Sequence, residues 1–149
     1  MDRRKFLQTA FASGALFAID GLISNSEANE TFFEGTPIFK PEIKTVHGQK
    51  HTPFIDAPKK VKAGEFFEVR VITGYYHPHP NKVEHHIEWS SLYINAFEAG
   101  QATFKATISN PDVTFKVKID SKGKSILRAF SYCNIHGLWL SFPKEIEVV

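Results

Sequence analysis

The chain has 149 residues, and its 18 lysines and arginines against 16 acidic residues give a formal net charge of +2. So small a charge excludes the strongly basic surface typical of nucleic-acid-binding proteins. The length suits one domain with one hydrophobic core, and a single cysteine, Cys133, excludes an intramolecular disulfide.

The first residues of the chain resemble an export signal. Arg3 and Arg4 precede a moderately apolar run that ends at Ile19, too short and too interrupted for a transmembrane helix. This pattern is typical of a twin-arginine signal, and the small residues around Ala28 form a cleavage site. We therefore expect a signal at residues 1–28, recognition by the twin-arginine export machinery and a periplasmic protein. An uncleaved membrane anchor and an ordinary amphipathic helix are the alternatives.

The remaining residues, 29–149, are predicted to form one all-β domain. Apolar and polar residues alternate in Phe67–Val71, which is the period of a β-strand. Turn signals rich in asparagine, proline, aspartate and glycine separate further apolar runs, and no helix is evident. This spacing predicts an immunoglobulin-like antiparallel β-sandwich. The other expected strands are 86–94, 102–108, 113–119, 125–132 and 145–149.

Histidines are concentrated in one loop. Four of the seven lie within residues 76–86. Pro78 and Pro80 restrict the backbone there, so the loop loses little conformational entropy when its imidazoles bind a ligand. His85 and His86 are adjacent on an extended segment, so their side chains point in opposite directions. At most one of the two therefore faces a given site.

Near the C-terminus, Cys133 and His136 form a C-x-x-H pattern that allows a thiolate and an imidazole to converge on one ion. This pair of ligand types suits zinc, copper or iron rather than calcium or magnesium. Together with the histidine-rich loop, the pattern predicts a metal site. The alternative is a buried cysteine with polar histidines scattered around it.

Three segments in order resemble one known family. They are GQKHTP at 48–53, HPNKVEHHI at 79–87 and CNIHGLW at 133–139. They closely resemble the superoxide reductases of the neelaredoxin and desulfoferrodoxin type, whose fold is also a β-sandwich. The separate rubredoxin-like module of desulfoferrodoxins needs four cysteines of its own, so this chain resembles the one-iron class.

The resemblance implies a mononuclear non-haem iron that cycles between Fe(II) and Fe(III). The reaction would be the one-electron reduction of superoxide to hydrogen peroxide, with re-reduction by a rubredoxin-like or other redox protein. His86 should point away, and His47 and His77 fall outside the motifs and are treated as non-ligands. The implied ligands are four equatorial histidines and one axial cysteine: His51, His79, His85, His136 and Cys133.

Three further roles follow from the resemblance. Lys50 matches a family lysine beside the open coordination position, where its charge would attract the anionic substrate and stabilise the bound product. The backbone amides of Ile135 and His136 would tune the donor strength of the sulfur. Gln49 stands where the family usually has a glutamate that binds ferric iron, and a neutral amide is a poor ligand for that ion.

Two other classes of protein compete with this interpretation. An exported cupredoxin also carries a cysteine and a histidine near the end of a β-sandwich, but blue-copper sites usually add an axial methionine, and the only methionine here is Met1. A metal-free binding module could present the histidine-rich loop to a partner. Structural zinc is disfavoured because closed zinc sites use four ligands. The sequence leaves homo-oligomerisation open.

Overall fold

The computed structural model describes residues 31–33 and 36–149, so the predicted signal at 1–28 lies outside the described residues. The chain divides into two units, residues 1–38 and 39–149. At the end of the first unit, β1 (Thr31–Phe33) pairs antiparallel with β2 (Thr36–Phe39). Within the described residues, no helix has the length and apolar character needed to cross a bilayer.

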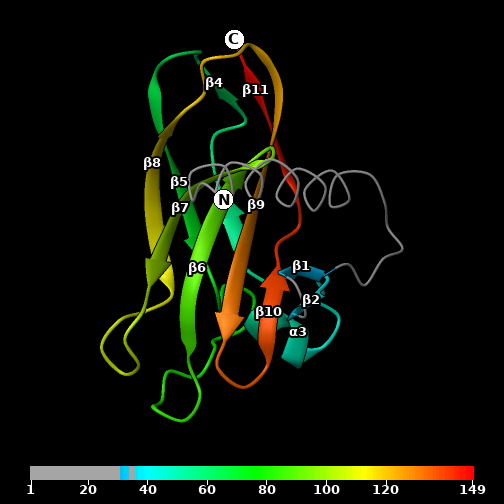
Figure 1. The fold of residues 1–149 in the computed structure, drawn as a ribbon, viewed down its shortest axis with the longest axis vertical. Helices are drawn as coiled ribbons and strands as arrows, with labels where there is room; N and C mark the ends of the chain where they lie inside the picture. The colour runs from blue at the N-terminus through cyan, green and yellow to red at the C-terminus, as the bar shows by residue number, and fades with distance from the viewer. Residues whose placement is uncertain (1–30, 34–35) are drawn as a thin grey trace, which may run out of the picture. The chain divides into compact units, whose positions relative to one another are not determined.

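The larger sheet of the second unit is built around one long strand, β9 (Gly123–Cys133). On one edge of β9 lies β6 (Ile87–Ile94), which in turn pairs with β7 (Phe97–Thr103). On the other edge, β10 (Gly137–Leu140) pairs with the C-terminal part of β9, and β11 (Lys144–Val148) pairs with its N-terminal part (Figure 1). The short strand β4 (Lys60–Val61) runs parallel to β11.

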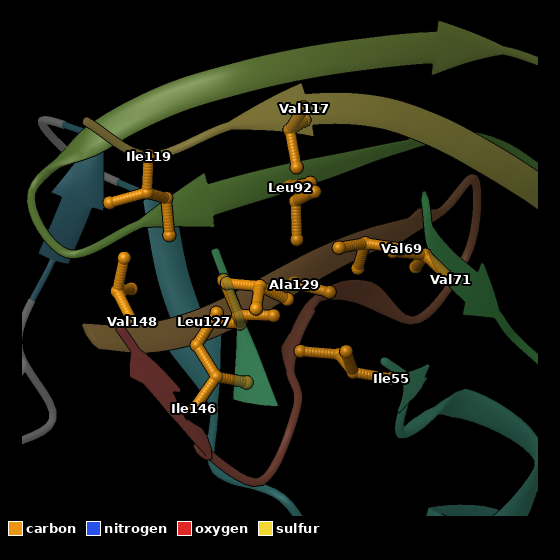
Figure 2. Close-up of a cluster of buried hydrophobic side chains, with 11 residues drawn as sticks. Ile55, Val69, Val71, Leu92, Val117, Ile119, Leu127, Ala129, Ile146 and Val148 are labelled. Atoms are coloured by element: carbon orange, nitrogen blue, oxygen red, sulfur yellow. The ribbon is translucent and has the colours of Figure 1, made fainter. Parts of the chain in front are cut away.

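A second, smaller sheet contains three antiparallel strands in the order β3 (Phe54–Asp56), β5 (Phe66–Ile72) and β8 (Asp112–Lys118). Side chains from both sheets form the hydrophobic core (Figure 2). Leu92, Leu127 and Ala129 of the larger sheet are fully buried in one cluster with Val69 and Val71 of the smaller one. The predicted all-β sandwich is therefore confirmed, and β4 and β11 form a parallel pair within its larger sheet.

Two expectations about single elements were wrong. The strand expected at 102–108 lies earlier, at Phe97–Thr103, because Asn95 has a positive φ of 52° and turns the chain tightly after β6. The second error concerns helices. No helix was evident in the sequence of residues 29–149, but Val46–His51 forms the short helix α3. This helix is too short for a periodic apolar pattern, so only its cap could have predicted it.

Candidate metal centre

Strand pairing brings the histidine-bearing segments to one end of the sandwich. Ile87 pairs with Cys133, which places the start of β6 and the preceding histidine loop beside the end of β9. Phe54 pairs with Ile72, so α3, which ends just before β3, lies near the start of the same loop. The turn between β9 and β10 completes this end, at the bottom of Figure 1.

Asn134 ties the histidine loop to the cysteine turn. Its side-chain oxygen accepts from the His86 backbone N–H at 2.9 Å, and its side-chain nitrogen donates to the Glu84 carbonyl at 3.0 Å. Its own backbone N–H donates to the His86 carbonyl. These three bonds surround His85, so they fix the backbone of that residue beside Cys133. The sequence motif contained Asn134, but sequence reasoning assigned it no role.

The rings of His51, His79, His85 and His136 stand at the corners of a square. Neighbouring rings have centroid distances of 4.7 to 4.8 Å and are nearly perpendicular, with interplanar angles of 74° to 83°. The diagonal from His51 to His85 is longer, at 6.1 Å, and these two rings are nearly parallel, at 24°. Four imidazoles around one point is the arrangement expected of four equatorial ligands.

Cys133 is fully buried and belongs to the same group of residues. Its sulfur and one nitrogen each of His51, His79 and His85 all lie within 4.8 Å of one another. His136 adjoins this group, since its Nδ1 lies 3.0 Å from His51 Nε2 and 3.7 Å from Cys133 Sγ. The structure thus brings all five residues of the predicted ligand set together.

Hydrogen bonds orient two of the imidazoles. His51 Nδ1 donates to the His47 carbonyl at 2.7 Å, and His79 Nδ1 donates to the Pro80 carbonyl at 2.6 Å. A carbonyl can only accept, so each Nδ1 carries the proton and each Nε2 keeps its lone pair. Metal-bound histidines are oriented by such bonds on the other ring nitrogen.

Two ring nitrogens of the cluster lack hydrogen-bond partners among the described residues. His79 Nε2 and His85 Nε2 are buried and make no hydrogen bond with any of the described residues. A buried polar atom without a hydrogen-bond partner costs free energy. Two nitrogen lone pairs and a sulfur that converge on one point suit a metal ion. The donor set of four imidazoles and one thiolate fits iron, copper or zinc rather than calcium or magnesium.

Burial also sets the protonation states. It lowers the pKa of His51 to about 3 and that of His79 to about 4, and it lowers the pKa values of His85 and His136 as well. These imidazoles are therefore neutral near pH 7 and able to bind a metal. Burial raises the pKa of the Cys133 thiol, so a bound cation is needed to stabilise the thiolate.

Two backbone groups act on the cysteine sulfur. The N–H groups of Ile135 and His136 donate to Cys133 and counteract the rise of its pKa. They are the two amides that the sequence predicted. Because they stabilise negative charge on the sulfur, they would reduce the electron density that a thiolate gives to a metal.

The N-terminal side of the site depends on Glu42 and Thr45. Thr45 caps α3 by accepting from the Gly48 N–H at 3.0 Å, and its own N–H donates to the Glu42 carboxylate at 2.9 Å. Gly48 packs so closely on Glu42 that an added Cβ would overlap the backbone oxygen and the carboxylate of Glu42. The glycine therefore sets the position of the helix that ends at His51.

Trp139 packs against the outside of the histidine square. Its ring stacks on His51 at a centroid distance of 5.0 Å and on Phe39 at 4.7 Å. Its indole N–H donates to the His136 carbonyl at 3.2 Å. Trp139 therefore restrains two corners of the square at once.

The other residues singled out in the sequence lie around this group. Lys50 is close enough to His79 and His85 for its charge to lower their pKa values. The Gln49 side chain donates to the Ile43 carbonyl at 3.0 Å. His86 and His77 belong to neither of the potential metal-binding groups found among the described residues.

His47 also lies beside the histidine square, a position that the sequence did not predict. It was expected to be a non-ligand, yet one of its ring nitrogens lies within 4.8 Å of nitrogens of His51 and His136. The i,i+4 spacing of His47 and His51 places both on one face of α3. The threonine cap at Thr45 is the sequence signal that could have predicted this helix and hence the pair.

The amino-acid sequence of this chain is similar to those of several known proteins. The family model described as Desulfoferrodoxin matches residues 43–142. A superoxide reductase of Pyrococcus abyssi is 40% identical over 101 residues, covering 62% of this chain and 84% of that protein. The neelaredoxin of Megalodesulfovibrio gigas is 38% identical over 111 residues, covering 62% and 84%.

Solved structures are similar as well. A superoxide reductase (neelaredoxin) from Ignicoccus hospitalis superposes with a TM-score of 0.65 at 40% identity, covering 75% of this chain and 95% of that one. The superoxide reductase (neelaredoxin) from Archaeoglobus fulgidus in the reduced form gives a TM-score of 0.55 at 34% identity, covering 66% and 90%. The likeness therefore extends to sequence as well as fold.

Proposed function

Because this chain belongs to the desulfoferrodoxin family, we propose that it is a superoxide reductase with one mononuclear non-haem iron. The observation that carries the proposal is the convergence of four imidazoles in a square with a single buried thiol. The reaction combines superoxide, one electron and two protons to give hydrogen peroxide. The named relatives and the chemistry of the donor atoms support the same reaction.

Five residues would hold the iron, namely His51, His79, His85, His136 and Cys133. When bound, the iron supplies the electron for superoxide and one coordination position that the five donors leave open. The neutral imidazoles need no proton release to bind it near pH 7, since their pKa values are lowered by burial. Asn134 and Trp139 keep the donors in place through their contacts with the histidine loop and with His51.

Lys50 gives the site a positive charge near the histidines. Its charge acts on His79 and His85, two adjacent corners of the square. A cation there would attract superoxide, which is a small anion, and raise its rate of association. It would also stabilise negative charge on the bound substrate as the electron is transferred.

The square of imidazoles also separates this proposal from the copper alternative. A blue-copper site uses two histidines and one cysteine, with a weak axial ligand. Here four rings share equal spacing, which leaves two of them unexplained in a cupredoxin. Iron with four imidazoles and one thiolate accounts for all of them.

We further propose that the protein acts in the periplasm and is re-reduced by a separate redox protein. The twin arginines Arg3 and Arg4 and the small residues before Ala28 support export by the twin-arginine route. One cysteine cannot form the separate four-cysteine, rubredoxin-like iron module of desulfoferrodoxins. The electron donor must therefore be another molecule, such as a rubredoxin-like protein.

Metal analysis of protein purified without oxygen tests the proposed function. The expected result is one iron per chain, together with superoxide consumption that requires added reductant and yields one hydrogen peroxide per superoxide. Stoichiometric copper without this activity would favour the cupredoxin alternative. Protein that binds no metal, even after reconstitution, would favour the binding module.

A further inference from the structure

A fifth histidine stands beside the square of four. One ring nitrogen of His47 lies within 4.8 Å of a nitrogen of His51 and a nitrogen of His136. His51 and His136 are neighbouring corners of the square, so His47 lies along one of its edges. Sequence motifs gave no reason to place it there.

The spacing of the His47 ring matches that of the ligand rings themselves. Its centroid lies 4.5 Å from that of His51 and 4.7 Å from that of His136. Neighbouring rings within the square are 4.7 to 4.8 Å apart. His47 thus approaches two corners as closely as those corners approach each other.

His47 lies on the accessible side of the group. Its side chain is exposed, whereas Cys133 is fully buried and is absent from the group that contains His47. His47 therefore lies on the exposed side of the site, beside the edge of the square formed by His51 and His136.

Nothing described in the structure holds the His47 ring elsewhere. Among residues 36–149, no hydrogen bond or ion pair of its ring nitrogens is found, and its only ring contacts are with His51, His136 and Trp139. Its backbone is fixed, because the His47 carbonyl accepts from His51 Nδ1. The ring can therefore turn about its side-chain bonds while the helix keeps it at the site.

The neighbouring Gln49 does not compete for this position. Its side-chain amide donates to the Ile43 carbonyl, which holds it in a local bond of the preceding loop. A neutral imidazole is also a better ligand than an amide for iron and other transition metals. His47 is thus the stronger additional donor on α3.

We propose that His47 is a reversible sixth ligand, which binds the oxidised metal and leaves when an added anion takes its place. The inference rests on the proposed iron centre. His47 would protect the open position of the resting protein from small anions, and its release would expose that position beside Lys50.

The test compares wild type, His47→Ala and His77→Ala after anaerobic loading with iron and oxidation. His77 is a matched control, since it lies in the histidine-rich loop but outside both potential metal-binding groups. The readouts are iron content, the visible absorption band of the ferric form and its affinity for azide. None of them depends on superoxide turnover.

We expect His47→Ala to keep its iron, to shift the ferric band to lower energy and to bind azide more tightly. If His47 occupies the position in about nine molecules of ten, the gain in azide affinity is about tenfold, because apparent affinity scales with the open fraction. Added imidazole should restore the wild-type band in His47→Ala. His77→Ala should match wild type in every respect.

The outcomes separate the two proposals. Iron-loaded His47→Ala with the band and azide affinity of wild type would overturn the ligand role of His47 and leave the superoxide reductase proposal intact. A wild type that takes up no iron would overturn the metal centre and the inference with it. Loss of iron from His47→Ala, with the fold retained by circular dichroism, would overturn the reversible role, because it would make His47 a residue that the iron needs in order to stay bound.

Discussion

His51 Nε2 lies 3.0 Å from His136 Nδ1, although 85 positions separate the two residues in the chain. His51 ends a short helix, and His136 lies in the turn between β9 and β10. This distance fits two neighbouring donors to one ion.

Replacing His85 and replacing the adjacent His86 should have very different effects on iron binding. His85→Ala should lower iron content and affinity, because it removes one corner of the square, whereas His86→Ala should retain one iron per chain. Cys133→Ser should abolish the thiolate-to-iron absorption of the oxidised protein. Iron analysis and visible spectra check these outcomes. Loss of iron from His86→Ala but not from His85→Ala would show that the choice within the pair is wrong.

Replacing Lys50 should affect the rate of reaction rather than metal binding. Lys50→Ala should slow the reaction of the reduced protein with superoxide by about tenfold, since it removes a charge that attracts the anion. The remaining rate should depend less on ionic strength, because salt screens such a charge over about 8–10 Å. Pulse radiolysis at several salt concentrations measures both effects. A rate and salt dependence equal to those of wild type would make Lys50 an ordinary surface lysine.

Gln49→Glu tests the position at which this chain departs from the family pattern. A carboxylate is harder and more anionic than an amide, so it should stabilise the ferric state if it reaches the metal. We expect a lower reduction potential, a ferric band at higher energy and weaker azide binding. The reaction of the reduced protein with superoxide should change little.

Redox titration and azide titration beside wild type measure these changes. Identical potentials and azide affinities would mean that the side chain at 49 does not reach the iron, in keeping with its bond to Ile43. Gln49→Ala is the control, since it removes the amide without adding charge.

Gly48→Ala should disturb the site through the backbone. The new methyl group would overlap the Glu42 oxygens, so α3 must shift and carry His51 out of position. We expect weaker iron binding and a loss of about 1–3 kcal/mol in the free energy of unfolding, as is usual for overpacking. Val46→Ala, an exposed change in the same helix, is the control and should leave both quantities nearly unchanged. A Gly48→Ala protein with wild-type iron affinity would show that α3 tolerates the shift.

The metal-free protein should lose stability as the pH falls. Burial lowers the pKa of His51 from 6.5 to about 3 and that of His79 to about 4, so below pH 6.5 the unfolded chain binds protons that the folded chain does not. Stability therefore falls from about pH 6.5 towards pH 4, by up to about 1.4 kcal/mol per pH unit for each such histidine.

Urea unfolding of the metal-free protein at several pH values measures this slope. His51→Ala should reduce the slope by up to about 1.4 kcal/mol per pH unit, which corresponds to one proton. A free energy of unfolding that stays constant over this range would contradict the neutral, buried state of the two histidines.

The sequence by itself determined the chemistry of the site. The motifs around His51, around His79 and His85, and around Cys133 and His136 contain every residue that the structure brings into the square and its thiol. Residue type and local spacing suffice for this, because a ligand is defined by its donor atom. Alternation of apolar residues likewise sufficed for the sandwich, since a strand with one buried face must follow that period.

Only the tertiary structure decided how these segments meet and what else lies beside them. Convergence depends on the register of distant strands, such as Ile87 opposite Cys133, which no local pattern specifies. The position of β7 depends on a tight turn at Asn95, and the place of His47 depends on a helix of six residues. None of these features leaves a periodic pattern of apolar residues in the sequence. Packing and hydrogen bonding in the folded chain determined them instead.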